Sequence, residues 1–304
     1  MFIFWISLLL FSSSVLADKD LLVLVHGHAS DPGIWGTFEK YFTDNNADFE
    51  IYKYNYSSKT DQMLRDTRDD LLVDVSKRLK PGQIPHFVGH SMGGLVARSA
   101  LYKANWEFPD DSPYNYGALV TLGTPNHGAL GSCMCCLVVE TFGVSCTDAV
   151  KNMCELDGTS FQWNCNWLGD LNSNTEGAKD YYSDDWVQAW TIDGDMLVEP
   201  KNAGIRGVDK KIASCNDEEY KQSNTGCKGG AWSTDVHNSI VRKTSVLRGV
   251  FNYLHDEGTS AKLFHQGQGR GRSIGHSHSR RAPAPTTSQP EHTIQCIQQC
   301  LGAN

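Results

Sequence analysis

The chain has 304 residues, of which 40% are hydrophobic and 20% are charged, and its formal net charge is -8 at pH 7. This length suits one large domain with a tail, and the hydrophobic content is ordinary for a globular protein. The negative charge argues against a surface that binds the phosphates of nucleic acid.

An apolar run opens the chain. Residues 1–17 read MFIFWISLLLFSSSVLA and end in small residues before Asp18, which is typical of a secretory signal peptide cleaved near Ala17-Asp18. A single membrane anchor is the alternative, but the run falls short of the roughly 20 apolar residues that a spanning helix needs. We therefore expect a secreted protein whose mature chain has no transmembrane segment.

Strands and helices alternate along much of the chain. The continuous apolar run at 21–25, bounded by His26-Gly27, predicts a strand that is buried on both faces of a parallel sheet. The predicted strands are 21–25, 49–56, 86–88, 118–122, 187–192 and 211–215, and the predicted helices are 34–44, 61–80, 92–105 and about 240–254. This alternation implies right-handed crossovers and a mostly parallel sheet of about six strands with helices on both faces.

A stretch rich in Cys, Asn, Gly and Trp, residues 126–185, follows the fourth predicted strand and is too long for an ordinary loop. It holds six of the ten cysteines, and an even number of cysteines in an oxidising compartment predicts disulfides of open connectivity. Zinc is the rival for Cys133-x-Cys135-Cys136, but this cluster lacks the paired Cys-x-x-Cys spacing of structural zinc sites. We expect a disulfide-pinned insertion and no metal site.

Residues 258–304 form a low-complexity tail after a folded domain that spans 18–257. The tail is rich in Gly, Ser, His, Arg, Gln and Pro and has almost nothing with which to build a core. Its histidines could bind a metal adventitiously, but a solvated tail is the favoured interpretation. Cys296 and Cys300 at its far end could pair with each other or attach the tail to the domain.

The segment Gly89-His90-Ser91-Met92-Gly93 fits the pattern G-x-S-x-G. It lies between a predicted strand and a predicted helix, which is the context of a nucleophile elbow. The sharp turn of an elbow crowds its backbone, so Gly89 and Gly93 are needed to admit the neighbouring strand and helix. The sequence therefore predicts Ser91 as the nucleophile of a serine hydrolase.

A serine hydroxyl needs a base to take its proton and an acid to orient that base. After a nucleophile elbow these groups follow in the order serine, acid, histidine. His127 precedes the plausible acid, His255 follows the final predicted helix, and the later histidines lie in the tail. His237 is left as the predicted base.

Three aspartates compete for the role of the acid. Asp195 stands at the carboxyl end of the predicted strand 187–192, directly before the apolar Met-Leu-Val. Asp193 suits a turn former better, and Asp235 lies too close to His237 along the chain. We favour Asp195.

An oxyanion that forms during acyl transfer needs two fixed N–H donors. The backbone N–H of Met92, the residue after the nucleophile, is the first candidate. The second is the backbone N–H of His28 in the loop after the first strand, where Gly27 lets the backbone approach closely.

Taken together, these motifs resemble the secreted lipases of the α/β-hydrolase superfamily, especially the small class 2 lipases of bacterial and nematode type. The matching blocks run in family order over about residues 20–255: Val25-His26-Gly27, Gly89-His90-Ser91-Met92-Gly93-Gly94, Val120-Thr121-Leu122-Gly123-Thr124-Pro125, Asp195-Met196-Leu197-Val198 and Val236-His237. The resemblance implies an α/β-hydrolase fold and a triad of Ser91, Asp195 and His237, with the N–H groups of His28 and Met92 as oxyanion donors. It also implies cleavage of carboxylic esters, above all acylglycerol lipids, without a cofactor and at a lipid–water interface.

The chain departs from the minimal members of that family in its tail and in the insertion at 126–185. The minimal enzymes expose their active site, whereas this insertion would form a lid or a wall of the acyl pocket. A carboxylesterase or thioesterase that acts on short-chain or non-lipid substrates would use the same three residues. A binding protein on a hydrolase scaffold is the alternative from another class, and the intact triad argues against it. The sequence does not indicate an oligomeric state.

Overall fold

The computed structural model describes residues 19–104, 117–129, 146–154, 167–176, 186–221 and 234–255. The predicted signal peptide at 1–17, the tail at 258–304 and much of the stretch 126–185 lie outside these residues. In the described part of the chain, no helix is both long enough and apolar enough to cross a membrane.

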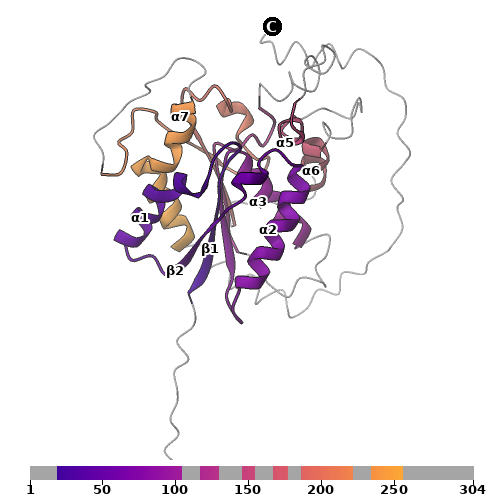
Figure 1. Cartoon of the computed structure of the whole chain (residues 1–304). Coiled ribbons are helices and arrows are strands. Elements are labelled where there is room, and N and C mark those ends of the chain that lie inside the picture. The colour runs from indigo at the N-terminus through magenta and orange to yellow at the C-terminus, as the bar shows by residue number, and fades with distance from the viewer. Residues whose placement is uncertain are drawn as a thin grey trace, which may run out of the picture.

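A single sheet of six parallel strands forms the centre of the molecule, in the order β2-β1-β3-β4-β5-β6 (Figure 1). The strands are β1 (Asp20–Val25), β2 (Phe49–Tyr54), β3 (Pro85–His90), β4 (Leu119–Leu122), β5 (Val187–Ile192) and β6 (Lys210–Ala213). The inner strands are buried along their whole length, whereas the edge strands β2 and β6 keep exposed positions. The predicted sheet of about six strands is confirmed, and the described strands are all parallel.

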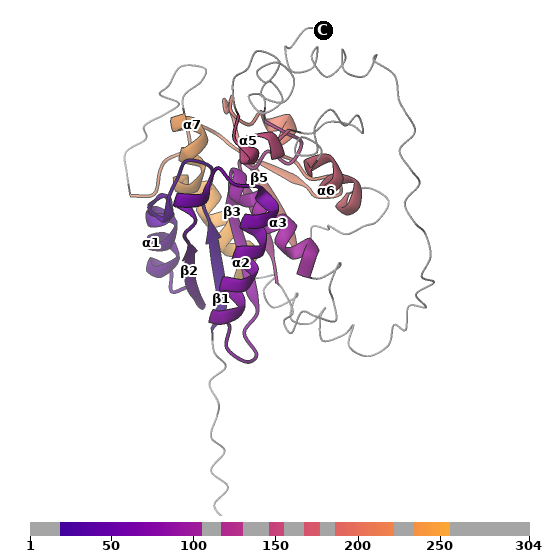
Figure 2. The same ribbon diagram turned by 45° about the vertical axis from the view of Figure 1, so that its right-hand side comes forward.

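Helices cover both faces of this sheet (Figures 1 and 2). The helix α1 and a helical segment at 244–255 lie on one face, and α2 and α3 lie on the other. Besides the helix at 244–255, the described α-helices are α1 (Gly36–Asp44), α2 (Leu64–Arg78), α3 (Met92–Tyr102), α5 (Asp148–Asn152), α6 (Trp167–Thr175) and α7 (Thr234–Ser239). Short 3₁₀ turns are η1 (Pro32–Trp35), η2 (Ser57–Lys59), η6 (Pro200–Asn202) and η7 (Ile240–Arg242).

Two hydrophobic cores follow from the alternation of side chains along each strand. In β1, Leu21, Val23 and Val25 pack into one core with the apolar faces of α2 and α3. Leu22 and Leu24 point the other way and pack with α1 and the segment 244–255. A strand that is covered on both faces needs apolar residues at every position, which explains the continuous run at 21–25.

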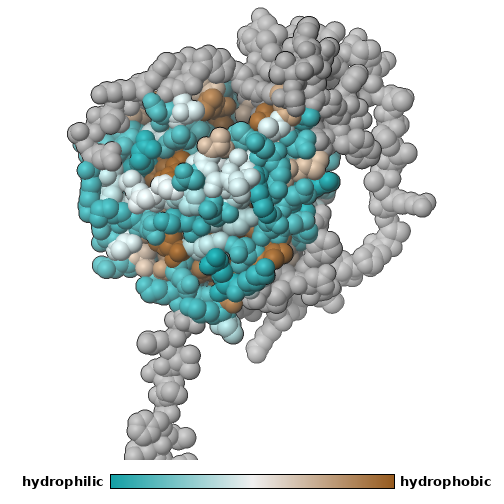
Figure 3. Space-filling model, viewed as in Figure 1, coloured by the Kyte–Doolittle hydropathy of each residue, from teal (hydrophilic) through white to brown (hydrophobic). Residues whose placement is uncertain are grey.

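Polar side chains dominate the outside of the described part of the chain. The face in Figure 3 is mainly hydrophilic, with small separate hydrophobic areas. Val73, Met196 and Ile212 are the large hydrophobic residues that are exposed among those described. This is the usual result of packing apolar surface against both faces of a sheet.

The structure corrects the sequence prediction near the end of the domain. The predicted helix over about 240–254 starts instead as the 3₁₀ turn η7, and the α-helix covers 244–255. Between them Lys243 is extended and forms an isolated antiparallel bridge with Glu219, which prevents a continuous helix. The predicted strand 211–215 is likewise shifted to Lys210–Ala213.

The stretch 126–185 is described only in part, and that part holds the two helices α5 and α6. Cys146 and Cys215 are each disulfide-bonded. The cluster Cys133-x-Cys135-Cys136 and the tail residues Cys296 and Cys300 lie outside the described residues, so the predicted disulfide framework as a whole stays a prediction.

Candidate active site

Ser91 occupies a strained turn between β3 and α3. Its backbone has a φ of 55° and a ψ of -131°, a region that non-glycine residues rarely adopt. A Cβ atom on Gly93 would lie 2.2 Å from the carbonyl oxygen of His26, and one on Gly89 would lie 2.4 Å from the Cα of Gly94. Only glycine at these two positions allows β1 and α3 to approach the turn so closely.

The register of the sheet brings four strand ends to the same edge. Val25 in β1 lies beside Gly89 in β3, Gly89 lies beside Thr121 in β4, and Thr121 lies beside Ala189 in β5. The residues that follow these positions therefore meet at the carboxyl edge of the sheet, where α/β sheets bind their ligands.

Asp195 and His237 form a buried pair at this edge. His237 Nδ1 lies 2.7 Å from Asp195 Oδ2, and the two residues are 5% and 2% exposed. The other carboxylate oxygen, Oδ1, accepts hydrogen bonds of 3.0 Å from the backbone N–H groups of Leu197 and Val198. The carboxylate is thus held by its own turn and aimed at the imidazole, as an orienting acid requires.

The structure separates the three competing aspartates. Asp193 and Asp235 are exposed, whereas Asp195 is buried against His237. The pair that the sequence favoured is therefore in contact. His237 lies within the short helix α7 rather than in a loop between elements, a difference from the predicted local structure.

Backbone contacts link Ser91 to this pair. The N–H of Ser91 donates a 2.9 Å hydrogen bond to the carbonyl of Leu122, the last residue of β4. The next residue, Gly123, has a φ of 57°, and a Cβ there would lie 3.3 Å from His237 Cε1 and 3.7 Å from Asp195 Oδ2. The end of β4 therefore packs between the serine and the buried pair.

The loop after β1 runs along the other side of Ser91. A Cβ on Gly27 would lie 2.8 Å from Ser91 Cβ and 3.4 Å from Ser91 Oγ. The next residue, His28, is partly exposed, and its Nε2 lies 3.1 Å from Asp61 Oδ1. Met92 is the first residue of α3, so its N–H lies at the positive end of a helix. Met92 directly follows Ser91, and His28 follows the glycine that approaches Ser91, so the assignment of their N–H groups as oxyanion donors stays a prediction.

Tyr56 braces this loop, and sequence reasoning missed it. Its ring stacks on His26 with 4.2 Å between centroids, and its hydroxyl donates to the carbonyl oxygen of His26. Burial lowers the pKa of His26, whose ring therefore packs in its neutral form. The sequence predicts a strand over 49–56, the observed strand β2 ends at Tyr54, and no local pattern marks Tyr56 as a partner of His26.

His90, the residue before the serine, is a second contact that sequence reasoning did not use. Its Nε2 lies 3.3 Å from the carbonyl oxygen of His237, and the two imidazole rings have centroids 4.8 Å apart. Burial first, and then the neighbouring His237, hold the pKa of His90 well below its usual value. His90 is therefore neutral and can donate its Nε2 proton to that carbonyl.

A sequence model of the family described as "Conditioned medium factor C-terminal domain" matches residues 17–235. The chain belongs to this family. The match covers the elbow and Asp195 and ends just before His237. A search of curated protein sequences returns no match.

Solved structures provide a second comparison for this chain. The mature form of a Bacillus licheniformis lipase, BlEst2, is similar with a TM-score of 0.51 and 16% identity, over 78% of this chain and 92% of that one. The propeptide form of the same lipase has a TM-score of 0.50 and 15% identity, over 77% of this chain and 50% of that one. The domain therefore has the α/β-hydrolase fold, whereas the resemblance to class 2 lipases stays a prediction.

Within the described residues, no group of three or more His, Cys, Asp or Glu side chains could hold a metal ion. The nucleophilic and ionisable groups that the structure brings to this edge of the sheet include the hydroxyl of Ser91 and the buried pair of His237 and Asp195.

Proposed function

We propose that the protein is a serine hydrolase that cleaves carboxylic esters, with acylglycerol lipids as its preferred substrates. The observation that carries this proposal is the buried pair of Asp195 and His237, linked through the end of β4 to a strained serine in an elbow. Strain at one residue persists only where the surrounding structure enforces it, and it clusters at functional sites. The similar fold of a protein named a lipase supports the ester class.

The proposed reaction proceeds through an acyl-enzyme. The hydroxyl oxygen of Ser91 attacks the ester carbonyl carbon while Nε2 of His237 takes its proton. The carboxylate of Asp195 accepts a hydrogen bond from the Nδ1–H of His237, which keeps the proton on Nδ1 and leaves Nε2 free to act as the base. The N–H groups of Met92 and His28 stabilise the oxyanion.

The intermediate then collapses, and the protonated His237 gives its proton to the departing alkoxide, which leaves as an alcohol. Water attacks the acyl-enzyme by the same route, with His237 again taking and returning a proton. This second half releases the carboxylic acid and restores the Ser91 hydroxyl.

Replacement of Ser91 by alanine tests this proposal. We expect ester hydrolysis to fall by about 10⁴-fold or more, the usual scale for removal of a triad member, and labelling by a fluorophosphonate probe to disappear. Ser58→Ala, at an exposed serine, is the matched control and should keep both activities. Hydrolysis that persists in purified Ser91→Ala would refute the proposal.

Two outcomes would redirect the substrate class. A rate profile over esters of increasing acyl length, with and without a lipid–water interface, separates a lipase from a carboxylesterase of short soluble esters. Faster turnover of thioesters than of matched oxygen esters would favour a thioesterase. A chain that binds esters but neither turns them over nor labels would be a binding protein on a hydrolase scaffold.

We also propose that the protein is secreted after removal of residues 1–17. The support is the apolar run and its small-residue end, together with the start of β1 at Asp20, soon after the proposed cleavage point near Ala17-Asp18. N-terminal sequencing of protein recovered from the culture medium tests this. An intact residue 1 in that protein would contradict it.

A further inference from the structure

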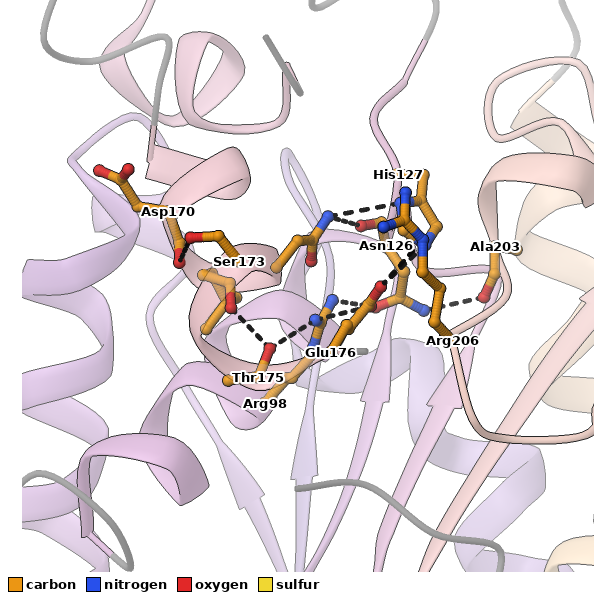
Figure 4. A network of polar contacts seen from close by, with 11 residues as sticks. Arg98, Asn126, His127, Asp170, Ser173, Thr175, Glu176, Ala203 and Arg206 are labelled. Carbon is orange, nitrogen blue, oxygen red and sulfur yellow. Dashed lines mark hydrogen bonds and ion pairs between the residues drawn. The ribbon is translucent and has the colours of Figure 1, made fainter. Parts of the chain in front are cut away.

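A buried guanidinium lies at the centre of the polar network in Figure 4. Arg98, on α3, is fully buried, and its Nη2 donates to Glu176 Oε1 at 2.8 Å and to Thr175 Oγ1 at 2.9 Å. Its Nη1 donates to Asn126 Oδ1 at 3.3 Å. One side chain of the helix that follows the proposed nucleophile therefore binds both the end of α6 and the loop after β4.

The second oxygen of the Glu176 carboxylate also lies among donors. Its Oε2 is 3.3 Å from Nε2 of His127 and 3.8 Å from Nε of Arg206. The side chain of Glu176 is 1% exposed, so the carboxylate is removed from water together with Arg98. We call the contacts among Arg98, Asn126, Thr175 and Glu176 the Arg98 clamp.

Asn126 extends the clamp to a fourth segment and adds a second contact with α6. The side-chain Nδ2 of Asn126 donates to the backbone carbonyl of Ala203 at 2.8 Å. The backbone carbonyl of Asn126 accepts from Asn172 Nδ2 at 2.8 Å. Ala203 follows the turn that contains Asp195, and Asn172 belongs to α6. As Figure 4 shows, side chains from α3, the loop after β4, α6 and the loop after η6 converge there.

Three of these segments lead directly to the proposed catalytic residues. The helix α3 begins after Ser91, the loop of Asn126 begins at Gly123 against His237, and the loop of Ala203 follows Asp195. The fourth segment, α6, belongs to the Cys-rich stretch. The clamp thus joins α6 to all three parts of the site.

The apolar side of α6 shares a core with the helix that follows the elbow. Leu168 and Leu171 of α6 pack in the same hydrophobic core as Met92, the proposed oxyanion donor. Ala149 and Met153, in and after α5, belong to this core too. The two helices therefore share a hydrophobic core with the residue that follows the proposed nucleophile.

A buried ion pair is poor evidence for stability, because well-packed apolar residues of similar volume often do as well or better. A buried ion pair contributes more clearly to conformational specificity. Charged partners accept few alternative arrangements, whereas apolar side chains can slide and repack. A purely structural role would therefore be fulfilled by apolar contacts such as those of Leu168 and Leu171. The charged clamp adds a unique placement of α6.

We propose that Arg98 and Glu176 are positioning residues that hold α6 as a fixed wall of the acyl-binding site and so determine which acyl chains it accepts. This inference rests on the proposed ester hydrolysis. It assigns selectivity to a fixed arrangement of α6, not to its opening and closing.

The double variant Arg98→Met/Glu176→Met tests the inference, because it removes both charges and leaves no buried ion without a partner. We expect the ratio of kcat/KM for a long-chain to a short-chain p-nitrophenyl ester to change by about tenfold or more, a typical reach for apolar pocket discrimination. Labelling of Ser91 by a small fluorophosphonate should stay within about threefold of wild type, since the clamp does not touch the reacting atoms. Hydrogen exchange of residues 167–176 should be slow in the wild type and faster in the double variant.

Two further variants keep the test decisive. Thr175→Val removes one acceptor of Arg98 with almost no change in shape, so it should shift the ratio in the same direction by a smaller factor even if the double variant fails to fold. Arg65→Met, at an exposed arginine of α2, is the matched control and should leave the ratio unchanged.

An unchanged ratio in variants that fold and label would overturn the inference and leave the proposed hydrolase intact. Rapid exchange of residues 167–176 in the wild-type protein would also overturn it. If the wild-type protein neither labels nor hydrolyses esters, the proposed function fails and the inference fails with it. These results are distinguishable because labelling of Ser91 is read separately from the acyl-length ratio.

Discussion

Replacement of Asp195 by asparagine tests the orientation of the proposed base with little change in shape. The asparagine oxygen can still accept from the N–H groups of Leu197 and Val198, which now bind Oδ1 at 3.0 Å. Its amide nitrogen then takes the place of Oδ2, 2.7 Å from Nδ1 of His237. An NH₂ group donates a proton, so the imidazole must accept at Nδ1 and carry its own proton on Nε2.

That tautomer cannot take a proton from Ser91. The loss expected for a correct geometry with the wrong tautomer is about 10⁴-fold in kcat, as in the serine protease triad that serves as the reference case. At about 1.36 kcal/mol for each factor of ten, this is about 5.4 kcal/mol of transition-state stabilisation. The two hydrogen bonds to the turn persist, so the free energy of unfolding should change by no more than about 1–2 kcal/mol.

The assay is kcat and KM for a soluble p-nitrophenyl ester, with urea denaturation of the same preparations. Asp193→Asn is the matched control, because Asp193 lies in the same turn but is exposed, and its kcat should stay near that of the wild type. A loss of kcat of less than about tenfold in folded Asp195→Asn would refute the assignment of Asp195 as the orienting acid. A comparable loss in Asp193→Asn would refute it equally.

Three other variants probe the surroundings of the site. Gly93→Ala places a Cβ 2.2 Å from the carbonyl oxygen of His26, so we expect lost activity and a thermal midpoint lower by several degrees, whereas Gly36→Ala, with open space around its Cβ, should change neither. Burial holds the pKa of His90 below its usual 6.5, so only the unfolded chain binds the proton as the pH falls. The contribution of His90 to the free energy of unfolding should therefore be complete above about pH 6.5 and should decrease below it by up to about 1.4 kcal/mol per pH unit. In urea titrations at a series of pH values, His90→Asn should make that decrease smaller. Lys243→Met removes the buried donor that binds two partly buried carbonyls at 2.8 and 2.9 Å and should cost about 1–3 kcal/mol in urea denaturation, and a cost below about 0.5 kcal/mol would contradict this.

Local patterns carried the sequence prediction of the sheet and of the elbow. The run at 21–25 is apolar because both faces of β1 are covered, so the burial of this strand can be recognised from consecutive apolar residues. The elbow needs a strand, a serine between two glycines and a helix within a short segment. Asp195 and His237, 42 residues apart, were paired by motif order and by the position of Asp195 after a strand. Such features can be read along the chain because each is decided by neighbours in sequence.

The supporting contacts of the site have no such local signature. Arg98 sits in the middle of an apolar helix, and its partner Glu176 is 78 residues away in a stretch where the sequence pattern breaks down. A charged residue in a predicted helix is equally compatible with an exposed position, whereas Arg98 is buried among partners from distant segments, including Thr175 and Glu176. The same holds for Tyr56, whose hydroxyl binds the carbonyl of His26 across 30 residues.

The residues at the strand ends and the long-range contacts around them would respond differently to mutations that change the substrate. The groups that would perform the chemistry are tied to strand ends, so the sheet keeps them in place while the segments beyond it vary. The proposed wall, α6, is joined to the segments that follow those strands through a few long-range polar contacts, of which the ion pair of Arg98 and Glu176 is the most buried. A change in any partner of Arg98 would therefore move the wall relative to Ser91 without touching the nucleophile. Under the proposed function, acyl selectivity would thus be more open to mutation than the proposed triad, and it would depend on residue pairs that sequence patterns do not reveal.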